Sequence, residues 1–193
     1  MNKSIISFFS LALIIFNCNL DLLGQDSTNK SSNLTIIDGT IGIITTNKKC
    51  HFGDSIPIFD RNLTVIKYFV REHEYSILDL ECLKILSTLF RVRLQDSTEA
   101  YIKKSNPLIK FQTWEETVLN VFSVGFDINQ NPIRKSPTTN SQIISYEKDE
   151  FYLPEKIQGD WLQIKWGSEG NWKYGWIKWK KNNKLLIELF HFA

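Results

Sequence analysis

Alternation between hydrophobic and polar residues is strongest in two runs near the C-terminal end of the chain. Residues 161–166 (WLQIKW) and 172–179 (WKYGWIKW) alternate on either side of a loop that contains two glycines. Strict alternation predicts a β-strand with one buried face, and two such runs around a glycine-containing loop predict a β-hairpin. Leu162, Ile164 and Trp166 share one face of this hairpin, which we expect to be the buried one.

After residue 35 the chain consists of short apolar runs separated by Asn, Asp, Gly and Pro, which predicts a mainly β protein. Strand-like runs are expected at residues 35–37, 40–46, 56–59, 65–70, 75–80, 90–94, 100–103, 118–126, 142–146 and 150–153, and an apolar run lies at 185–192. Residues 79–87 fit a short helix and a pair of strands equally well. Thr113 and Glu116 have the spacing of a capping box, which predicts a brief helix at the start of a second unit.

The hairpin has a weaker copy upstream, at a period of about 72–75 residues. Residues 89–94 (LFRVRL) align with 161–166, and residues 100–103 (AYIK) align with 175–178 (GWIK). Further matches in the same order are Pro57-Ile58 with Pro132-Ile133, Val65-Ile66 with Ile143-Ile144, and residues 75–78 with 151–153. The common order favours an internal duplication, and a chance match of short apolar runs is the alternative.

Three segments of the second copy occur in an order that is typical of one known family. Residues 131–144 (NPIRKSPTTNSQII) contain an apolar-Arg step, a turn with proline and a short strand. Residues 161–164 (WLQI) and 175–177 (GWI) follow in the order of a Trp-x-x-Val strand and a Gly-Trp-Val/Ile strand. This part of the chain, about residues 128–181, resembles the bacterial SH3-like (SH3b) family, with Ser136 where that family often has glycine.

The upstream copy, about residues 50–106, departs further from the family pattern. Leu89 replaces the first tryptophan, Ala100 replaces the glycine, and the Arg-x-x-Pro turn is missing. The resemblance implies two small tandem SH3-like barrels, a degenerate one at residues 35–112 and a clearer one at 113–193. Modules similar to these are appended to cell-wall enzymes, where they bind peptidoglycan peptides or other proteins.

The first 24 residues have the pattern of a signal peptide. Lys3 supplies a positive charge, and residues 5–16 (IISFFSLALIIF) form an apolar run that is short for a membrane span of about 20 residues. We expect cleavage after Gly24, a flexible polar lead-in at residues 25–34, and export of the mature chain to the periplasm or the medium. Lipidation of Cys18 and an uncleaved N-terminal anchor are the alternatives.

A barrel of this size has room for one face rich in aliphatic side chains, so some tryptophans are expected at the surface. Exposed Trp rings with a polar rim commonly mark binding patches. The predicted ligand patch comprises Trp161, Trp172, Tyr174, Trp176 and Trp179, with Lys165, Lys173 and Lys178 beside it. The lysines would bind carboxylates of a peptide or glycan, and the rings would contact its apolar side. Alternatively, the rings fill the seam between the barrels or cap a small core.

We predict no catalytic residue, no metal site and no cofactor. Cys50 and Cys82 form either one disulfide in an oxidising compartment or a pair of small buried hydrophobic residues. Neither cysteine has the local signature of a nucleophile, and with His51 and His73 they lack the paired spacing of a closed zinc site. The net charge of +2 is too small to indicate nucleic-acid binding.

These features favour a non-enzymatic binding module of the bacterial envelope that recognises a cell-wall peptide or a protein. A dedicated interaction or inhibitor protein with one secreted or periplasmic partner is the alternative, and a cell-wall hydrolase is the least favoured. We expect no membrane span in the mature chain. Because the linker at residues 108–114 has no Gly/Ser run, we expect the two barrels to pack together, with Trp114 at the seam.

Overall fold

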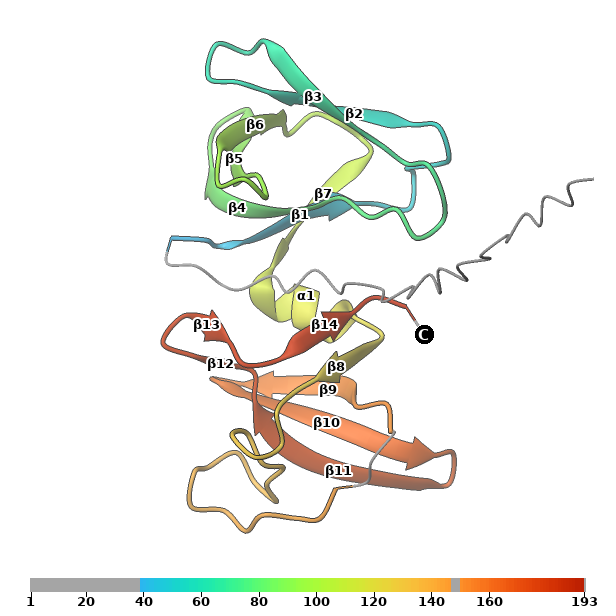
Figure 1. The fold of residues 1–193 in the computed structure, drawn as a ribbon, viewed down its shortest axis with the longest axis vertical. Coiled ribbons are helices and arrows are strands. Elements are labelled where there is room, and N and C mark those ends of the chain that lie inside the picture. The colour runs from blue at the N-terminus through green and yellow to red at the C-terminus, as the bar shows by residue number, and fades with distance from the viewer. Residues whose placement is uncertain (1–38, 147–149, 193) are drawn as a thin grey trace, which may run out of the picture.

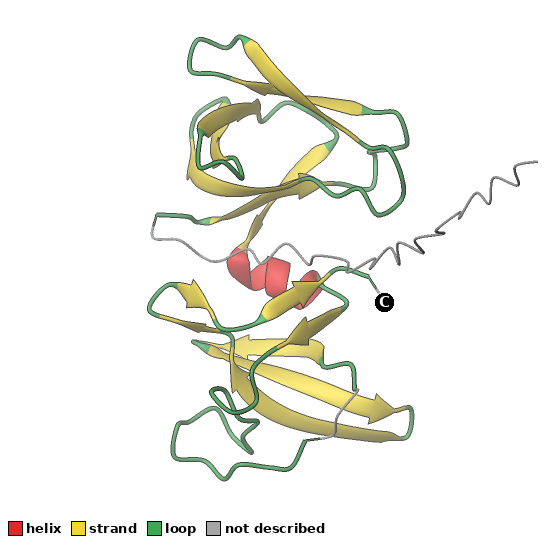
Figure 2. Ribbon diagram, viewed as in Figure 1, coloured by secondary structure: helices red, strands yellow, loops and turns green. Residues whose placement is uncertain are grey.

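The computed structural model describes residues 39–146 and 150–192, which form two β-rich lobes with one short helix between them (Figure 1, Figure 2). The strands of every sheet pair in antiparallel fashion, so the prediction of a mainly β protein is confirmed. The predicted signal peptide, the lead-in, Cys18 and the strand-like residues 35–37 lie outside the described residues.

The N-terminal lobe is one sheet of seven strands, in the order β3-β2-β6-β5-β4-β1-β7. Its strands are β1 (Gly42–Thr46), β2 (Ser55–Phe59), β3 (Val65–Val70), β4 (Asp79–Ile85), β5 (Leu89–Arg93), β6 (Glu99–Lys103) and β7 (Ile109–Thr113). Apolar side chains at alternating positions of these strands form its core, in which Ile44, Ile56, Val92 and Ile102 are fully buried or nearly so.

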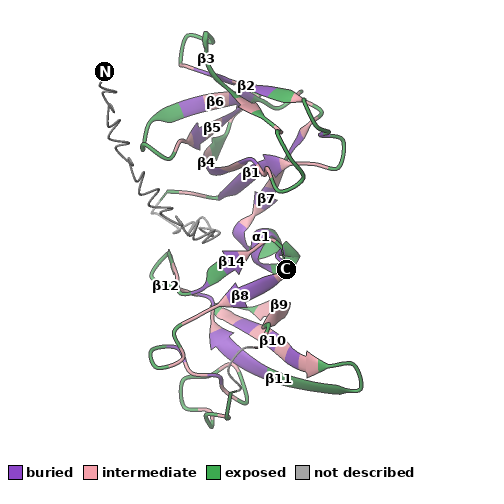
Figure 3. Ribbon diagram, turned by 45° about the vertical axis from the view of Figure 1, so that its right-hand side comes forward, coloured by how far each residue is buried: buried purple, intermediate pink, exposed green. Residues whose placement is uncertain are grey.

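The C-terminal lobe contains three small sheets, in the orders β11-β10-β9, β14-β8 and β12-β13. Its strands are β8 (Ser123–Gly125), β9 (Leu153–Gln158), β10 (Trp161–Ser168), β11 (Asn171–Lys178), β12 (Lys180–Lys181), β13 (Lys184–Leu185) and β14 (Glu188–Phe190). Leu162, Ile164, Trp166 and Ile177 of the predicted hairpin are buried in its core, which confirms the face chosen from the alternation. The tip of the β10–β11 hairpin is exposed (Figure 3).

The helix α1 (Trp114–Asn120) lies between the lobes (Figure 1). Its N-terminus has the predicted capping box: the Glu116 N–H donates to the Thr113 hydroxyl at 3.2 Å, and the Thr113 N–H donates to the Glu116 carboxylate at 2.8 Å. Trp114 and Val118 of α1 pack into the C-terminal core together with Ile43 of β1. The two lobes therefore share apolar contacts, and Trp114 lies at the seam.

Three polar or aromatic contacts also join the lobes. The Trp114 indole N–H donates to the Thr40 hydroxyl at 3.2 Å, close to a small cavity of about 150 Å³. At the C-terminal end, His191 Nε2 lies 3.5 Å from Asp79 Oδ2. The rings of Phe192 and Tyr75 meet edge to face, with 5.0 Å between their centroids.

The strand registers follow the alignment of the two hairpins. Leu89 lies opposite Lys103 and Val92 opposite Ala100, and in the second hairpin Trp161 lies opposite Lys178 and Ile164 opposite Gly175. The strand before each hairpin also carries a bulge at the corresponding place, at Leu83 in β4 and at Glu155 in β9. The two lobes thus share a pairing pattern and a local irregularity.

The matches at Pro57-Ile58 and Val65-Ile66 follow the same register. Phe59 pairs with Tyr101 and Val65, and Arg134 forms bridges to the corresponding residues, Trp176 and Ile143. The glycine of the second copy has a steric cause, because a Cβ at Gly175 would overlap the Ile133 side chain and lie 3.0 Å from Ile144 Cδ1.

Three expectations need correction, and one pair of alternatives is resolved. Leu80 and Tyr152 occupy equivalent positions, because they pair with Ile44 and Val124, so residues 75–78 do not correspond to 151–153. The ambiguous residues 79–87 form strand β4 as far as Ile85, since Leu80 and Cys82 fill the core. Residues 118–126 are not one strand, because α1 continues to Asn120. Residues 142–146 contribute only an isolated bridge at Ile143.

Within the described residues, no sheet pairs its two edge strands with each other. The architecture at this level is therefore a set of open antiparallel sheets arranged as two lobes.

Candidate functional site

The predicted ligand patch does not form one surface. Trp176 and Trp179 are buried, with exposed fractions of 7% and 0%, and Trp161 is half-buried. Trp172 and Tyr174 are exposed, with fractions of 37% and 49%. Trp179 therefore belongs to the core, as the alternative interpretation of the tryptophans expected, whereas Trp176 is covered without being part of the core cluster.

The register of the hairpin explains which residues come together. Directly opposed residues of antiparallel strands point to the same side of a sheet. The outward-facing pairs of β10 and β11 are Trp161 with Lys178, Gln163 with Trp176, Lys165 with Tyr174, and Gly167 with Trp172. Lys173 lies opposite Trp166 and so points to the other side. The structure thus brings six of the eight predicted residues to the outward side of this sheet, all except Lys173 and Trp179.

Trp179 is buried because it follows the end of β11 and turns into the core. Its indole N–H donates to the Gly159 carbonyl at 2.9 Å, and the Lys180 Nζ lies 4.4 Å from the centre of its ring. A buried indole whose N–H has a partner is stable in a core. We therefore assign Trp179 to the fold and remove it from the candidate site.

Lysines lie over tryptophan rings along the outward side of this sheet. The Nζ atoms of Lys178, Lys165 and Lys156 lie 5.3, 5.2 and 5.5 Å from the ring centres of Trp161, Trp172 and Trp176, respectively. These are cation–π distances. We call the surface formed by Trp161, Lys165, Trp172, Tyr174, Trp176, Lys178 and Lys156 the basic aromatic face.

One acidic residue is tied to this face. Glu155, the bulge residue of β9, forms an ion pair with Lys165, and this contact raises the pKa of the Lys165 ammonium above its ordinary value. The ammonium therefore stays charged at neutral pH. Lys156 was not among the predicted residues, because its position over Trp176 depends on the pairing of β9 with β10.

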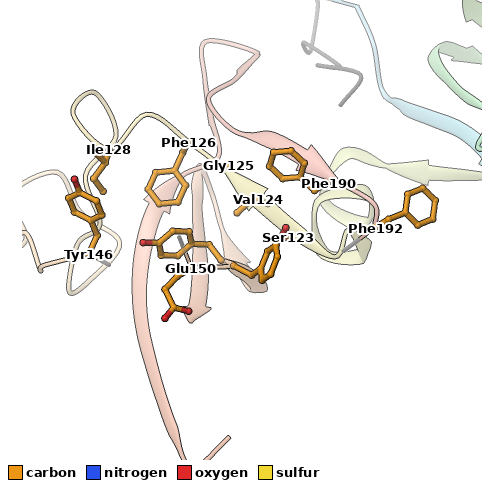
Figure 4. A pocket seen from close by; sticks show the side chains of 11 residues that line it. Ser123, Val124, Gly125, Phe126, Ile128, Tyr146, Glu150, Phe190 and Phe192 are labelled. Carbon is orange, nitrogen blue, oxygen red and sulfur yellow. The ribbon is translucent and has the colours of Figure 1, made fainter. Parts of the chain in front are cut away.

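A second aromatic surface lies on the same lobe, beside β8 and β14. A cavity of about 460 Å³ is lined by Ser123, Val124, Gly125, Phe126, Ile128, Tyr146, Glu150, Phe151, Tyr152, Phe190 and Phe192, and we call it the aromatic groove. In Figure 4, Tyr146 and Ile128 lie at one end, Phe190 and Phe192 lie toward the other, and Phe126 lies between them.

The groove combines aromatic walls with a single charged side chain. Six of its lining residues are Phe or Tyr, and Glu150 is the one that carries a charge. Phe126 and Tyr152 pack edge to face at 5.0 Å, and the Tyr152 ring in turn lies 5.6 Å from buried Trp166. One wall is thus fixed by the core, whereas Phe151 and Tyr146 are exposed.

Sequence analysis did not predict this groove. Its residues come from three separate segments, which only the pairing of β8 with β14 and with Tyr152 brings together. The available signal was the clustering of aromatic residues at 122–126, 151–152 and 190–192. Such clusters also suit a core, so composition alone does not separate the two cases.

The two described cysteines are free thiols in the N-terminal core. Cys50 and Cys82 are both fully buried and unbonded, so the possible disulfide is not formed and the alternative, small buried hydrophobic residues, fits the structure. Burial raises the pKa of Cys82 to about 11 and also raises that of Cys50. Both thiols are therefore protonated at neutral pH, which is unfavourable for a nucleophile.

In residues 39–146 and 150–192, no group of three or more His, Cys, Asp or Glu side chains is placed to hold a metal ion. Over the same residues, no helix has the length and apolar character needed to cross a bilayer.

Comparison with known proteins gives no relative from which a role could be transferred. No protein-family model, no curated protein and no solved structure matches the chain. The function is therefore inferred from the basic aromatic face and the aromatic groove.

Proposed function

We propose that the protein is a non-enzymatic binding module of the bacterial envelope that recognises a cell-wall peptide through the basic aromatic face. The observation that supports this most directly is the row of lysines held over tryptophan rings, beside exposed Trp172 and Tyr174. This arrangement presents apolar rings and ammonium groups side by side on a firm β-sheet.

Such a surface suits a ligand that has both carboxylates and apolar groups. Aromatic rings supply contact area with little loss of side-chain entropy, and the lysines attract carboxylates at the rim. A short peptide with acidic groups and small apolar side chains has this chemistry. Nucleic acid is a poorer fit, because Glu155 is paired with Lys165 and the chain has little net charge.

The proposal includes an SH3-like assignment for both lobes and export of the chain. The shared register of the two hairpins and the shared bulge support the duplication. The bridges of Arg134 to Trp176 and Ile143 support the match of the opening segment to the SH3-like pattern. The basic and apolar residues at the start of the sequence support a signal peptide and a periplasmic or secreted location.

Cosedimentation with purified peptidoglycan at low salt tests the cell-wall role. We expect the mature chain to pellet with the polymer, and the Trp172→Ala/Tyr174→Ala variant to lose most of this binding. Ile66→Ala/Tyr68→Ala is a matched control, because it removes two exposed apolar side chains from the other lobe. Absence of the parent protein from the pellet would contradict a cell-wall ligand.

A dedicated protein partner is the second candidate, and the aromatic groove favours it because apolar clefts commonly bind side chains of other proteins. Crosslinking from a photoreactive residue at Trp172 or at Phe151 in the native host would separate the two. A single protein partner captured from either position, without cell-wall fragments, would support the second candidate. Cell-wall fragments captured from position 172 would support the first.

A further inference from the structure

The strand registers allow the surroundings of the aromatic groove to be compared with the N-terminal lobe. Ile44 pairs with Leu80 and Phe111 in the same way as Val124 pairs with Tyr152 and Leu189. The same alignment extends to the residues next to these in the chain. Thr45, Asp79 and Gln112 therefore correspond to Gly125, Phe151 and Phe190, respectively. The last three line the groove.

In the N-terminal lobe, the corresponding surface is occupied by the end of the chain. His191 Nε2 lies 3.5 Å from the Asp79 carboxylate, and the Phe192 ring packs against Tyr75. We call this surface of Asp79 and Tyr75 the N-terminal seat. It binds a two-residue segment in which a basic residue precedes an aromatic one.

The C-terminal lobe has no described segment in the corresponding position, and the surface there is the aromatic groove. Phe192 joins the two, because it contacts Tyr75 of the seat and also lines one end of the groove. The groove is therefore continuous with an interface that already binds an aromatic side chain.

The chemistry of the groove resembles that of the seat. Where the seat has Asp79, the groove has Phe151, and the preceding residue, Glu150, supplies a carboxylate. Its volume of about 460 Å³ is within the range of ligand pockets, and edge-to-face contacts with its rings would favour an aromatic guest. A carboxylate beside such a pocket favours a cationic neighbour on the guest.

We propose that the aromatic groove binds an extended peptide segment of a partner protein in which a basic residue precedes an aromatic residue, as His191 precedes Phe192 in the N-terminal seat. The aromatic side chain enters between Tyr146, Phe151 and Phe190, and the basic residue pairs with Glu150. This site is separate from the basic aromatic face, so the two proposals can be tested independently.

The acetylated, amidated pentapeptide Glu-Leu-Phe-His-Phe is a suitable probe, because it reproduces the segment that the seat binds. Titration calorimetry with the full chain at pH 5.5, where an unperturbed histidine is mostly protonated, measures its affinity. We expect saturable binding, and a loss of about tenfold or more in Phe151→Ala and in Tyr146→Ala, whose exposed side chains can be removed without opening the core. The Glu150→Gln variant should bind this peptide more weakly. Its affinity for an analogue with Gln in place of His should be the same as that of the parent protein.

Two controls separate the groove from the other surfaces. The Tyr75→Ala and Trp172→Ala variants should retain the binding, because neither residue lines the groove. Unfolding midpoints of all variants check that the fold persists. Binding that is lost in Tyr75→Ala and kept in Phe151→Ala would overturn the proposal, and so would the absence of binding at millimolar peptide.

Discussion

The two lobes pair their hairpin strands in the same register but use the outward sides differently. In the N-terminal hairpin, Arg91 binds Glu99 through contacts of 2.5 to 2.9 Å, and Arg93 binds Glu81 at 3.0 Å. The positions of Arg91 and Glu99 are taken by Gln163 and Tyr174 in the second hairpin. Arg91 and Arg93 of the N-terminal hairpin are thus both paired with glutamates. In the C-terminal hairpin, Lys165 and Lys178 lie over tryptophan rings, and Lys165 is also paired with Glu155.

This difference indicates which lobe is available to a ligand. A carboxylate ligand of the N-terminal hairpin would have to replace an arginine partner that is already bound in two places. On the C-terminal face, Lys165 is paired with Glu155, but a ligand can approach the ammonium groups of Lys156 and Lys178, which lie over rings. The inward positions remain apolar in both hairpins, so the divergence lies on the surface and the folding pattern is retained.

The largest expected difference between the lobes concerns the residue that follows the hairpin. In the C-terminal lobe this is buried Trp179, and in the N-terminal lobe it is exposed Lys104. We expect Trp179→Ala to lower the free energy of unfolding by about 3–5 kcal/mol, because it leaves a large cavity. Lys104→Ala should change it by less than about 0.5 kcal/mol. Urea unfolding followed by circular dichroism measures both, and similar effects of the two variants would contradict the assignment of Trp179 to the core.

A smaller effect is expected at Gly175, which lies opposite Ile164 of β10. Gly175→Ala should lower the free energy of unfolding by about 1–3 kcal/mol, because the new methyl group overlaps Ile133 and lies tightly against Ile144. At the equivalent position, the N-terminal lobe already has buried Ala100. Ala100→Gly is the matched variant and should cost about 0.5–1 kcal/mol through backbone entropy. If Gly175→Ala unfolds at the same urea concentration as the parent, the steric explanation of this glycine is wrong.

The alignment of the two hairpins could be predicted from the sequence. Apolar and polar residues alternate with a period of two, and the pairing register of the strands must match this period to keep the apolar side chains on one face. Whether an individual aromatic ring is buried or exposed could not be predicted in this way. Trp176 lies on the outward side of its strand and is nonetheless buried, since Arg134 pairs alongside it and Lys156 lies over its ring. Both neighbours come from segments outside the hairpin, and no pattern within the hairpin identifies them.

The groove shows a second limit of the same kind. Its walls come from β8, from the segment before β9 and from β14, and their contact depends on which edges pair. The error at residues 75–78 has a related cause. Leu80 follows Val65 by 15 positions, whereas Tyr152 follows Ile143 by 9, and this difference moves the apolar run out of alignment. Loops of different length change spacing without changing the fold.

The carboxyl group of Asp79 provides a test of the seam that depends on pH. Burial raises the pKa of Asp79 above its ordinary value of 3.8, and His191 and the Thr45 hydroxyl only partly oppose this shift. A carboxyl group whose pKa is raised in the folded state favours folding less as the pH rises through that pKa. As the pH rises from about 4 to neutrality, the parent should therefore lose free energy of unfolding relative to the Asp79→Asn variant. A parent protein that gains on the variant over this range would show that the ion pair with His191 outweighs burial.

The smallest expected effect concerns the surface pair of Arg91 and Glu99, which has no counterpart in the C-terminal lobe. Both side chains are exposed, so water and salt screen their attraction, and exposed ion pairs contribute little to stability. We expect a double-mutant cycle of Arg91→Ala and Glu99→Ala to give a small favourable coupling that disappears in molar salt. The pair should matter more for binding than for folding. If Glu99 keeps acidic ligands from the arginines of the N-terminal hairpin, Glu99→Ala should give that hairpin a new, salt-sensitive affinity for peptidoglycan. Cosedimentation measures this affinity when Glu99→Ala is added to the Trp172→Ala/Tyr174→Ala variant, in which the C-terminal face no longer binds. No gain in that background would show that the missing aromatic rings, and not the neutralised arginines, separate the two lobes.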